Sequence, residues 1–317
     1  MKRKLVLFCA MALVFYGLPV QAAEKLKFGT AVKESAEYYL RVVAAEEKKL
    51  WEQNGLQVEW VPFKGAGEMF RSVAAGAIFT GFAATSSIVE AQVRGVPAVI
   101  VSDVVPYDPF VIWVRTDSRF KEPRDYKGAR VGVARFGGAQ HLYGQLIAKS
   151  LGVEKEVKFV SIGGIPEGWA AMKTGIIDAM VQPLRIMVKM KLAGEVKEFL
   201  RAADYLPKEW TGHALFTSKD FARTSPDIVA RVVKTVLQAS DYIQKDPRWA
   251  IDKMKEVSGY SEEAAKLIYE KDLSFSKDGR LSRRALENVV NFLVEYGVIA
   301  KDKAPRLEEV FTTQFTG

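Results

Sequence analysis

Small polar and charged residues follow the apolar, strand-like segments of this 317-residue chain where each segment would end. Glycines, hydroxyls, amides and cations at such points suit the binding of an anion, because the helix that follows presents unpaired N–H groups and a partial positive charge. The candidate ligand-binding residues are Lys33, Glu34, Ser35, Lys64, Gly65, Ala66, Thr85, Ser86, Phe136, Gly137, Gly138, Ala139, Gln140, Gly164, Ile165, Gln182, Pro183 and His213. The residue types predict noncovalent binding of a small anion.

Each of these loops also has a structural interpretation. Gly137 and Gly138 stand out, because glycines at a strand-to-helix junction often serve both the turn and close approach to a ligand. Thr85 could instead be an N-cap, Lys33 a solvated lysine and Gln182 a residue at the rim of a site. The sequence leaves both interpretations open.

Four further polar residues, and His213 among the candidates, have weaker claims. Arg135 and Arg185 could offer a two-pronged guanidinium to a sulfonate or carboxylate, although a solvated arginine is the default. Asp108 precedes a proline and is interpreted as a hinge or turn residue. His213 could face a cleft or be a structural histidine, and His141 is expected on a helix surface or behind the site.

Motifs for covalent or metal chemistry are missing from the sequence. It has no Gly-x-Ser-x-Gly elbow, no phosphate-loop lysine motif and no His-Glu-x-x-His pair. Its two histidines, His141 and His213, cannot by themselves form a usual metal site. We therefore expect no catalytic residues, no cofactor and no metal, although paired carboxylates cannot be judged from sequence.

The first residues predict export. Three cations at positions 2–4 precede an uncharged apolar run at 5–18, and small residues around Ala22 and Ala23 suit a signal peptidase. The apolar run is shorter than the ~20 residues that span a bilayer, so a membrane anchor is the weaker alternative. Cleavage would remove Cys9, the only cysteine, and lower the net charge from +8 to +5. We predict a periplasmic protein without disulfides; export argues against nucleic acid as a partner.

Two stretches about one lobe apart read alike. Residues 69–75 and 169–174 suit helices, Gly76 and Gly175 follow them, and apolar runs at 82–84 and 179–181 lead into small polar residues. A helix–glycine–strand–polar unit that occurs twice predicts two α/β lobes with polar loops at the strand ends. Any α/β protein repeats the order helix, glycine and strand, so this pair of units indicates two lobes only in combination with the rest of the chain.

Strand-like and helix-like segments alternate along the chain, which predicts parallel sheets covered by helices. Expected strands are 26–32, 56–61, 81–84, 98–101, 110–114, 130–134, 157–161, 179–181 and 212–216. Expected helices are 36–53, 68–75, 87–94, 137–151 (including a loop), 166–174, 227–243, 247–257, 261–271 and 282–296. Pauses near 105–110 and 207–213 predict a second lobe inserted into the first: 1–22 signal peptide, 23–107 with 213–317 as lobe I, and 108–212 as lobe II.

Taken in order, these motifs resemble the solute-binding proteins of ABC importers of the sulfonate/taurine/nitrate type, whose superfamily includes thiamine-pyrimidine synthesis proteins. The resemblance rests on segments 27–29, 54–58, 75–78, 95–97, 117–131 and 175–179. One departure is that Phe79 stands where the family's Gly-x-x-Asp motif has its acid, whereas the second copy keeps Asp178. This puts the geometry around Thr85 in question.

The resemblance implies a type II periplasmic-binding fold with two α/β lobes, a two-crossing hinge and a C-terminal helical segment. It further implies a monomer that captures a sulfonate-like or carboxylate-like solute and delivers it to a permease and its ATPase. Two alternatives stay open. One is an enzyme of the thiamine-pyrimidine type, which the missing cysteine cluster disfavours. The other is a secreted sensor subunit, which sequence alone does not distinguish from a transport protein.

Overall fold

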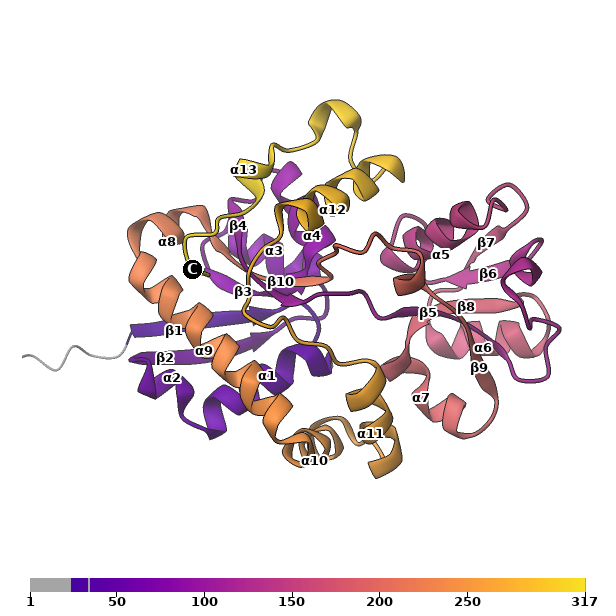
Figure 1. Cartoon of the computed structure of the whole chain (residues 1–317), viewed down its shortest axis with the longest axis horizontal. Helices are drawn as coiled ribbons and strands as arrows, with labels where there is room; N and C mark the ends of the chain where they lie inside the picture. The colour runs from indigo at the N-terminus through magenta and orange to yellow at the C-terminus, as the bar shows by residue number, and fades with distance from the viewer. Residues whose placement is uncertain (1–23, 34, 317) are drawn as a thin grey trace, which may run out of the picture.

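The chain forms two five-stranded mixed sheets joined by two crossing segments (Figure 1). The structure is a computed structural model that describes residues 24–33 and 35–316. The predicted signal peptide and Glu34 lie outside the described residues. In the part of the chain described, no helix is both long and apolar enough to cross a membrane.

The first sheet, with the helices around it, is called lobe I and has the strand order β2-β1-β3-β10-β4. Its elements are β1 (Glu24–Thr30), α1 (Ala36–Glu47), α2 (Leu50–Gln53), β2 (Leu56–Pro62), α3 (Ala66–Ala74), β3 (Thr80–Ala84), α4 (Thr85–Val93), β4 (Ala98–Val105) and β10 (His213–Ser218). Strand β1 pairs in parallel with β2 and β3, whereas β10 runs antiparallel between β3 and β4.

The second sheet, called lobe II, has the order β7-β6-β8-β5-β9. Its elements are β5 (Phe110–Arg115), η1 (Pro123–Tyr126), β6 (Arg130–Val133), α5 (Ala139–Ser150), β7 (Lys158–Ser161), α6 (Ile165–Lys173), β8 (Ala179–Pro183), α7 (Leu184–Leu192), β9 (Val196–Arg201) and η2 (Ala202–Asp204). Strands β6, β7 and β8 are parallel, and β5 runs antiparallel to both β8 and β9.

The rest of the chain is helical and returns to lobe I. It comprises α8 (Lys219–Thr224), α9 (Pro226–Lys245), α10 (Pro247–Ser258), α11 (Glu262–Lys271), α12 (Arg283–Glu295), η3 (Lys301–Lys303) and α13 (Leu307–Val310). The long helix α9 packs along α1 (Figure 1). Thr312 donates its N–H to Ile100 O at 3.0 Å, so the chain end covers part of the edge strand β4.

Each sheet has a packed interior. In lobe I, Phe28 and Phe82 lie on neighbouring strands with ring centroids 4.8 Å apart in an edge-to-face arrangement. In lobe II, Trp113 is fully buried on β5, which lies between β8 and β9, and its indole Nε1 donates to Gln182 O at 2.8 Å. That bond fixes the end of β8, where the sequence predicts a ligand-binding residue.

The twin units are present in both lobes, but they are anchored differently. Gly76 and Gly175 end α3 and α6 at φ values of 72° and 71°, in the left-handed region that glycine adopts without strain. Asp178 then accepts from Arg130 through N and Nε at 2.9 Å and through Nη2 at 2.7 Å. At the corresponding position of lobe I, Phe79 has no carboxylate and is held in another way. Its backbone carbonyl accepts from Ser218 N at 2.7 Å, and its ring stacks on Phe221.

Several expectations about local structure were wrong. The helix expected over 36–53 breaks at Lys49, a non-glycine residue with φ of 54°. Thr85 and Ser86 begin α4 rather than forming a loop, and Gln182 and Pro183 still belong to β8. The sheets are mixed, not parallel, because β5 and β10 each enter their sheet from the other lobe and run antiparallel to both neighbouring strands. The elements α7, α8 and β9 were not predicted, since their basic, half-exposed sequences hide the apolar periodicity.

The topology brings the carboxyl edges of the two sheets to face each other. Strand β4 is parallel to β3, so it ends at the carboxyl edge of lobe I, and β5 begins at the carboxyl edge of lobe II. The return path from β9 to β10 joins the same two edges. Both crossing segments, residues 106–109 and 202–212, therefore lie between these edges.

Candidate ligand-binding site

Six helices begin at the facing carboxyl edges. In lobe I, α1, α3 and α4 follow β1, β2 and β3; in lobe II, α5, α6 and α7 follow β6, β7 and β8. Each is a βα unit whose helix N-terminus lies where its strand ends, so unpaired N–H groups from both lobes point toward the space between them. Open α/β sheets bind ligands outside the carboxyl ends of their strands.

The loops after β1 and β2 lie side by side. Lys33 donates its N–H to Phe63 O at 3.1 Å, which places Lys33 next to Lys64. Both lysine side chains are exposed, and among the described residues neither has an ion-pair partner. Ser35 is buried at the start of α1, and Gly65 and Ala66 are half-buried at the start of α3. This corner of lobe I therefore carries two exposed cations at the carboxyl edge of its sheet.

Thr85 is fully buried at the end of β3. Its Oγ1 lies 3.2 Å from Thr211 Oγ1, and Thr211 Oγ1 lies 2.7 Å from Asp103 Oδ1, to which it donates. The Thr85 hydroxyl proton is therefore directed to Thr211. Ser86, one residue further, is half-buried on the same turn of α4.

In lobe II, two amides join the loops after β6 and β8. Gln140 Nε2 donates to Gln182 Oε1 at 3.2 Å, and Ala134 N donates to Gln140 Oε1 at 3.3 Å. Gly138 is buried beside them, and a Cβ there would lie 3.2 Å from Arg135 Cγ. The structure thus brings Gln140, Gln182 and the glycine loop together, and their contact with a ligand stays a prediction.

The remaining predicted residues of lobe II lie along the same edge. Phe136 is 58% exposed, and its ring meets His141 edge-on at 5.3 Å. Ala139 and Gly164 are exposed, Ile165 is half-buried at the start of α6, and Pro183 is buried. Arg135 is exposed and has no ion-pair partner within the described part of the chain.

A buried polar cluster lies where the two edges meet the crossing segments. His213 begins β10 and is 5% exposed; its Nδ1 lies 3.5 Å from Glu37 Oε1, and its Nε2 lies 3.9 Å from Asp108 Oδ1. Burial lowers the pKa of His213 to about 4, so its imidazole is neutral at pH 7. Burial alone would raise the pKa of Glu37, but the charge of the Arg185 guanidinium 3.0 Å away opposes it, and the net shift is downward.

Asp108 ties the two crossing segments together. Its Oδ2 accepts from Trp210 Nε1 at 2.7 Å and from the hydroxyl of Tyr143 in α5. Burial raises the pKa of Asp108 to about 6 despite these two donors. Asp108 therefore holds both segments and lobe II at once, in keeping with its interpretation as a hinge residue.

Arg185 has a different role from the one considered from sequence. Its Nη2 lies 3.0 Å from Glu37 Oε1, and its Nη1 lies 3.0 Å from Asp272 Oδ2. The two-pronged guanidinium binds carboxylates of its own chain and is not available to a ligand anion in this conformation. The positive charge at the facing edges is therefore carried by Lys33, Lys64 and Arg135.

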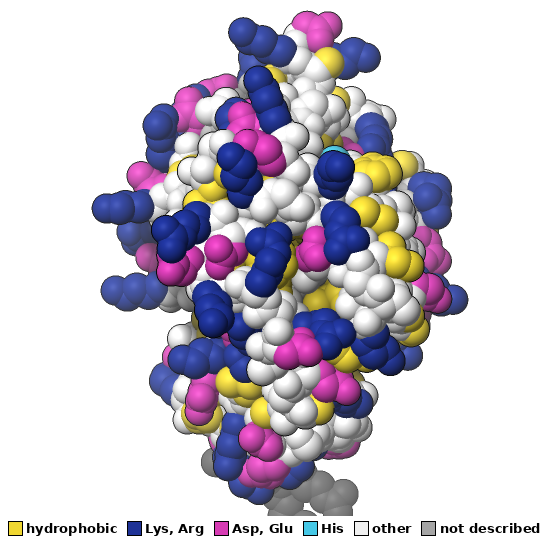
Figure 2. Space-filling view, turned by 90° about the vertical axis from the view of Figure 1, so that its right-hand side faces the viewer, with side chains coloured by type: hydrophobic (Ala, Val, Ile, Leu, Met, Phe, Trp, Pro, Cys, Tyr) yellow, Lys and Arg dark blue, Asp and Glu magenta, His cyan; other side chains and the backbone are white. Residues whose placement is uncertain are grey.

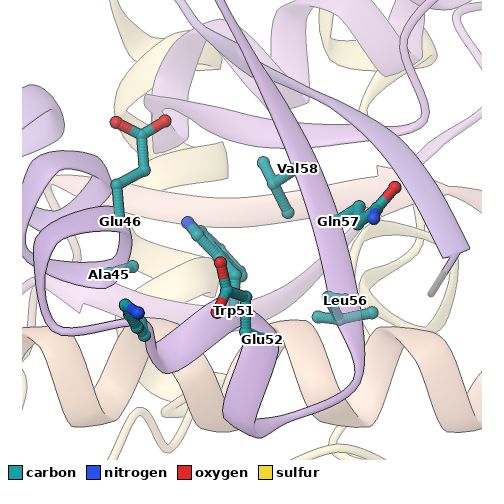
Figure 3. Close-up of a pocket in the computed structure, with 8 residues that line it drawn as sticks. Ala45, Glu46, Trp51, Glu52, Leu56, Gln57 and Val58 are labelled. Atoms are coloured by element: carbon teal, nitrogen blue, oxygen red, sulfur yellow. The ribbon is translucent and has the colours of Figure 1, made fainter.

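Two surface features lie elsewhere. Figure 3 shows a pocket of about 350 Å³ on lobe I, lined by residues of α1, α2 and β2 around Trp51, and none of the predicted site residues lines it. Figure 2 shows the lobe II end of the molecule, where lysines and arginines alternate with acidic side chains instead of forming one continuous patch. Neither feature belongs to the facing edges.

Sequence reasoning missed most of the buried cluster. Glu37 was not singled out, although an acid in the first turn of a helix that follows a strand is a recognisable signal. Asp103, Asp272 and Trp210 gave no local signal, because their partners are distant in sequence. Only the tertiary fold brings them into one cluster.

Two α/β lobes with facing carboxyl edges and two crossing segments define the class of periplasmic binding proteins. The aliphatic sulphonate binding protein SsuA from Escherichia coli has this fold: the TM-score is 0.76 at 18% identity, covering 90% of this chain and 91% of that chain. The alkanesulfonate-binding protein SsuA from Xanthomonas axonopodis, bound to MOPS, gives 0.70 at 18% identity, covering 92% and 99%. Identities this low establish the fold alone.

The chain belongs to the NMT1/THI5-like family, which matches residues 36–250. Proteins of Brucella abortus and Brucella suis, named only as binding proteins, are 23% identical over 259 residues, covering 80% of this chain and 77% of theirs. The resemblance to solute-binding proteins of ABC importers is thereby confirmed. The relatives found are binding proteins, and the family name also includes thiamine synthesis proteins.

Proposed function

We propose that this protein is the periplasmic solute-binding component of an ABC importer and captures a small organic anion between its two lobes. The observation that carries the proposal is the convergence of six helix N-termini on facing edges that also present Lys33, Lys64 and Arg135. Helix N-termini and unpaired cations together favour a sulfonate or carboxylate group. SsuA proteins of the same fold, which bind sulfonates by name, support the sulfonate class.

The lobes would close on the ligand by bending at the two crossing segments. Residues 23–107 with 213–317 would move against residues 108–212, and the ligand would favour the conformation in which both edges contact it. Delivery to a permease follows from the family resemblance and from the predicted export signal. In this proposal the protein binds its solute without changing it, whereas a thiamine-pyrimidine enzyme would convert it.

A thermal-shift screen tests the proposal. Sulfonates, carboxylates, nitrate and pyrimidines are added separately to ligand-free protein, and one anion class is expected to raise the Tm. A response to pyrimidines alone would favour the thiamine-pyrimidine alternative. No response from any class would refute anion capture.

Variants locate the site. Lys33→Ala, Lys64→Ala and Arg135→Ala are expected to reduce the ligand-induced shift, because each removes a cation at the facing edges. Lys158→Ala is the matched control, since Lys158 is an exposed lysine at the opposite edge of the lobe II sheet. Gly138→Val should abolish the shift, because its side chain would push against Arg135 in the glycine loop. Equal shifts in all variants would place the ligand elsewhere.

A further inference from the structure

One arginine of lobe II reaches across to two carboxylates of lobe I. Arg185 is in the first turn of α7; Glu37 belongs to α1, and Asp272 directly follows α11. Two different nitrogens make the contacts, Nη2 to Glu37 and Nη1 to Asp272, each at 3.0 Å. The same residue is tied through its backbone, because Tyr260 OH donates to Arg185 O at 3.2 Å.

This trio is shielded from water. The side chains of Arg185, Glu37 and Asp272 are 13%, 3% and 2% exposed. Figure 1 shows α7 beside α11 below the crossing segments, so the trio lies at one side of the hinge. Removing the Arg185 guanidinium while the lobes stay together would leave the Glu37 and Asp272 carboxylates buried without it, which is far more costly than removing one partner of an exposed pair.

The other side of the hinge provides a contrast. There Lys149 of α5 pairs with Glu295 of α12, and the two side chains are 53% and 46% exposed. Beside them Tyr143 stacks on Phe292 with ring centroids 5.5 Å apart. An exposed pair contributes little, because water and salt compete for both charges. The two interlobe ion pairs therefore differ in burial and should differ in effect.

We propose that Arg185 is an interlobe clasp, which holds α7 of lobe II against α1 and the end of α11 in lobe I and so fixes the lobe arrangement in the ligand-free protein. The two nitrogens of the guanidinium are essential to this role, because each binds a different carboxylate. A lysine has a single nitrogen and would keep one contact at most. The clasp is a positioning device and needs no contact with the solute.

Single-molecule fluorescence energy transfer between the lobes tests the clasp without any ligand. The exported chain suits this method because Cys9, its only cysteine, lies in the predicted signal peptide. Ala74→Cys in α3 and Ala170→Cys in α6 place dyes at exposed positions of lobe I and lobe II. The labelled protein is compared with Arg185→Met, Arg185→Lys and the control Lys149→Met.

The unmodified Arg185 protein should give one narrow distribution. Arg185→Met should raise the fraction of separated lobes at least about tenfold, Arg185→Lys should give an intermediate fraction, and Lys149→Met should match the parent. A parent-like distribution in Arg185→Met would overturn the clasp. Equal effects of Arg185→Met and Lys149→Met would also overturn it, because burial would then be irrelevant.

A second variant keeps the test decisive if Arg185→Met does not fold. Asp272→Asn removes one carboxylate but leaves Arg185 paired with Glu37. It should fold and broaden the distribution partway, as Arg185→Lys does. An Asp272→Asn protein with the parent distribution would contradict the two-carboxylate clasp. None of these outcomes depends on which solute the protein binds.

Discussion

Replacing Asp108 with asparagine should stabilise the protein at neutral pH, although it removes a carboxylate with two hydrogen-bond donors. Burial raises the pKa of Asp108 to about 6, against 3.8 for an ordinary aspartate. The folded protein therefore holds this proton more tightly than the unfolded chain does between pH 4 and 6. The stabilising contribution of Asp108 is complete below pH 3.8 and is lost as the pH rises through 6.

The size of this effect follows from the pKa difference. A shift from 3.8 to about 6 corresponds to about 3 kcal/mol of unfolding free energy. The asparagine side chain of the variant would stay neutral at every pH, and its amide oxygen could still accept from Trp210 and Tyr143. We expect Asp108→Asn to gain up to about 3 kcal/mol over the parent at pH 7.5 and about nothing at pH 4.

Urea denaturation at a series of pH values measures this difference directly. Asp108→Ala is the control for lost hydrogen bonds, because it leaves Trp210 Nε1 and the Tyr143 hydroxyl without their acceptor. That variant should lose roughly 2 kcal/mol or more at pH 4. A stability difference between Asp108→Asn and the parent that is the same at pH 4 and pH 7.5 would refute the reasoning.

Two further variants test the same region. His213→Gln should show the opposite pH dependence to Asp108→Asn. Burial lowers the pKa of His213 to about 4, so the stability that this residue contributes above pH 6.5 is lost as the pH falls toward 4. In the same urea series the variant should gain about 3 kcal/mol of unfolding free energy over the parent at pH 4, relative to pH 7.5. Gly212→Ala should destabilise the folded protein by several kcal/mol, because a Cβ at this position would lie 2.3 Å from Tyr107 O on the other crossing segment. Gly65→Ala is the control, because a Cβ at position 65 would meet nothing within 4 Å. Similar urea midpoints for Gly212→Ala and Gly65→Ala would mean that the two segments are free to separate.

The histidine and aspartate effects also explain why single variants are needed. Asp103, which accepts from Thr211, has its pKa raised to about 6 by burial and acts in the same direction as Asp108. His213 acts in the opposite direction over an overlapping pH range. In the parent protein these opposite pH dependences of stability partly cancel. Subtracting the stability of the parent from that of each variant at every pH separates the contribution of each residue.

Much of the fold was predictable from local sequence. The alternating helices and strands and the twin glycine units predicted α/β structure, because helix periodicity and left-handed glycine turns are local properties. The pauses near 105–110 and 207–213 predicted that one lobe is inserted into the other. The pairing of Gln140 with Gln182 was also within reach, since both residues lie at strand or helix ends that share one edge. The mixed character of the sheets was not, because β5, β9 and β10 pair with strands that are distant in sequence.

The sequence by itself determined where most of the helices and strands form, which strand ends carry polar residues, and that the chain resembles a two-lobed solute-binding family. Only the tertiary structure decided which charges remain available for a ligand. Arg185 is occupied by Glu37 and Asp272, whereas Lys33, Lys64 and Arg135 stay exposed. The physical reason is that burial and ion pairing depend on contacts between distant segments, and these contacts form only when the two crossing segments bring the lobes together.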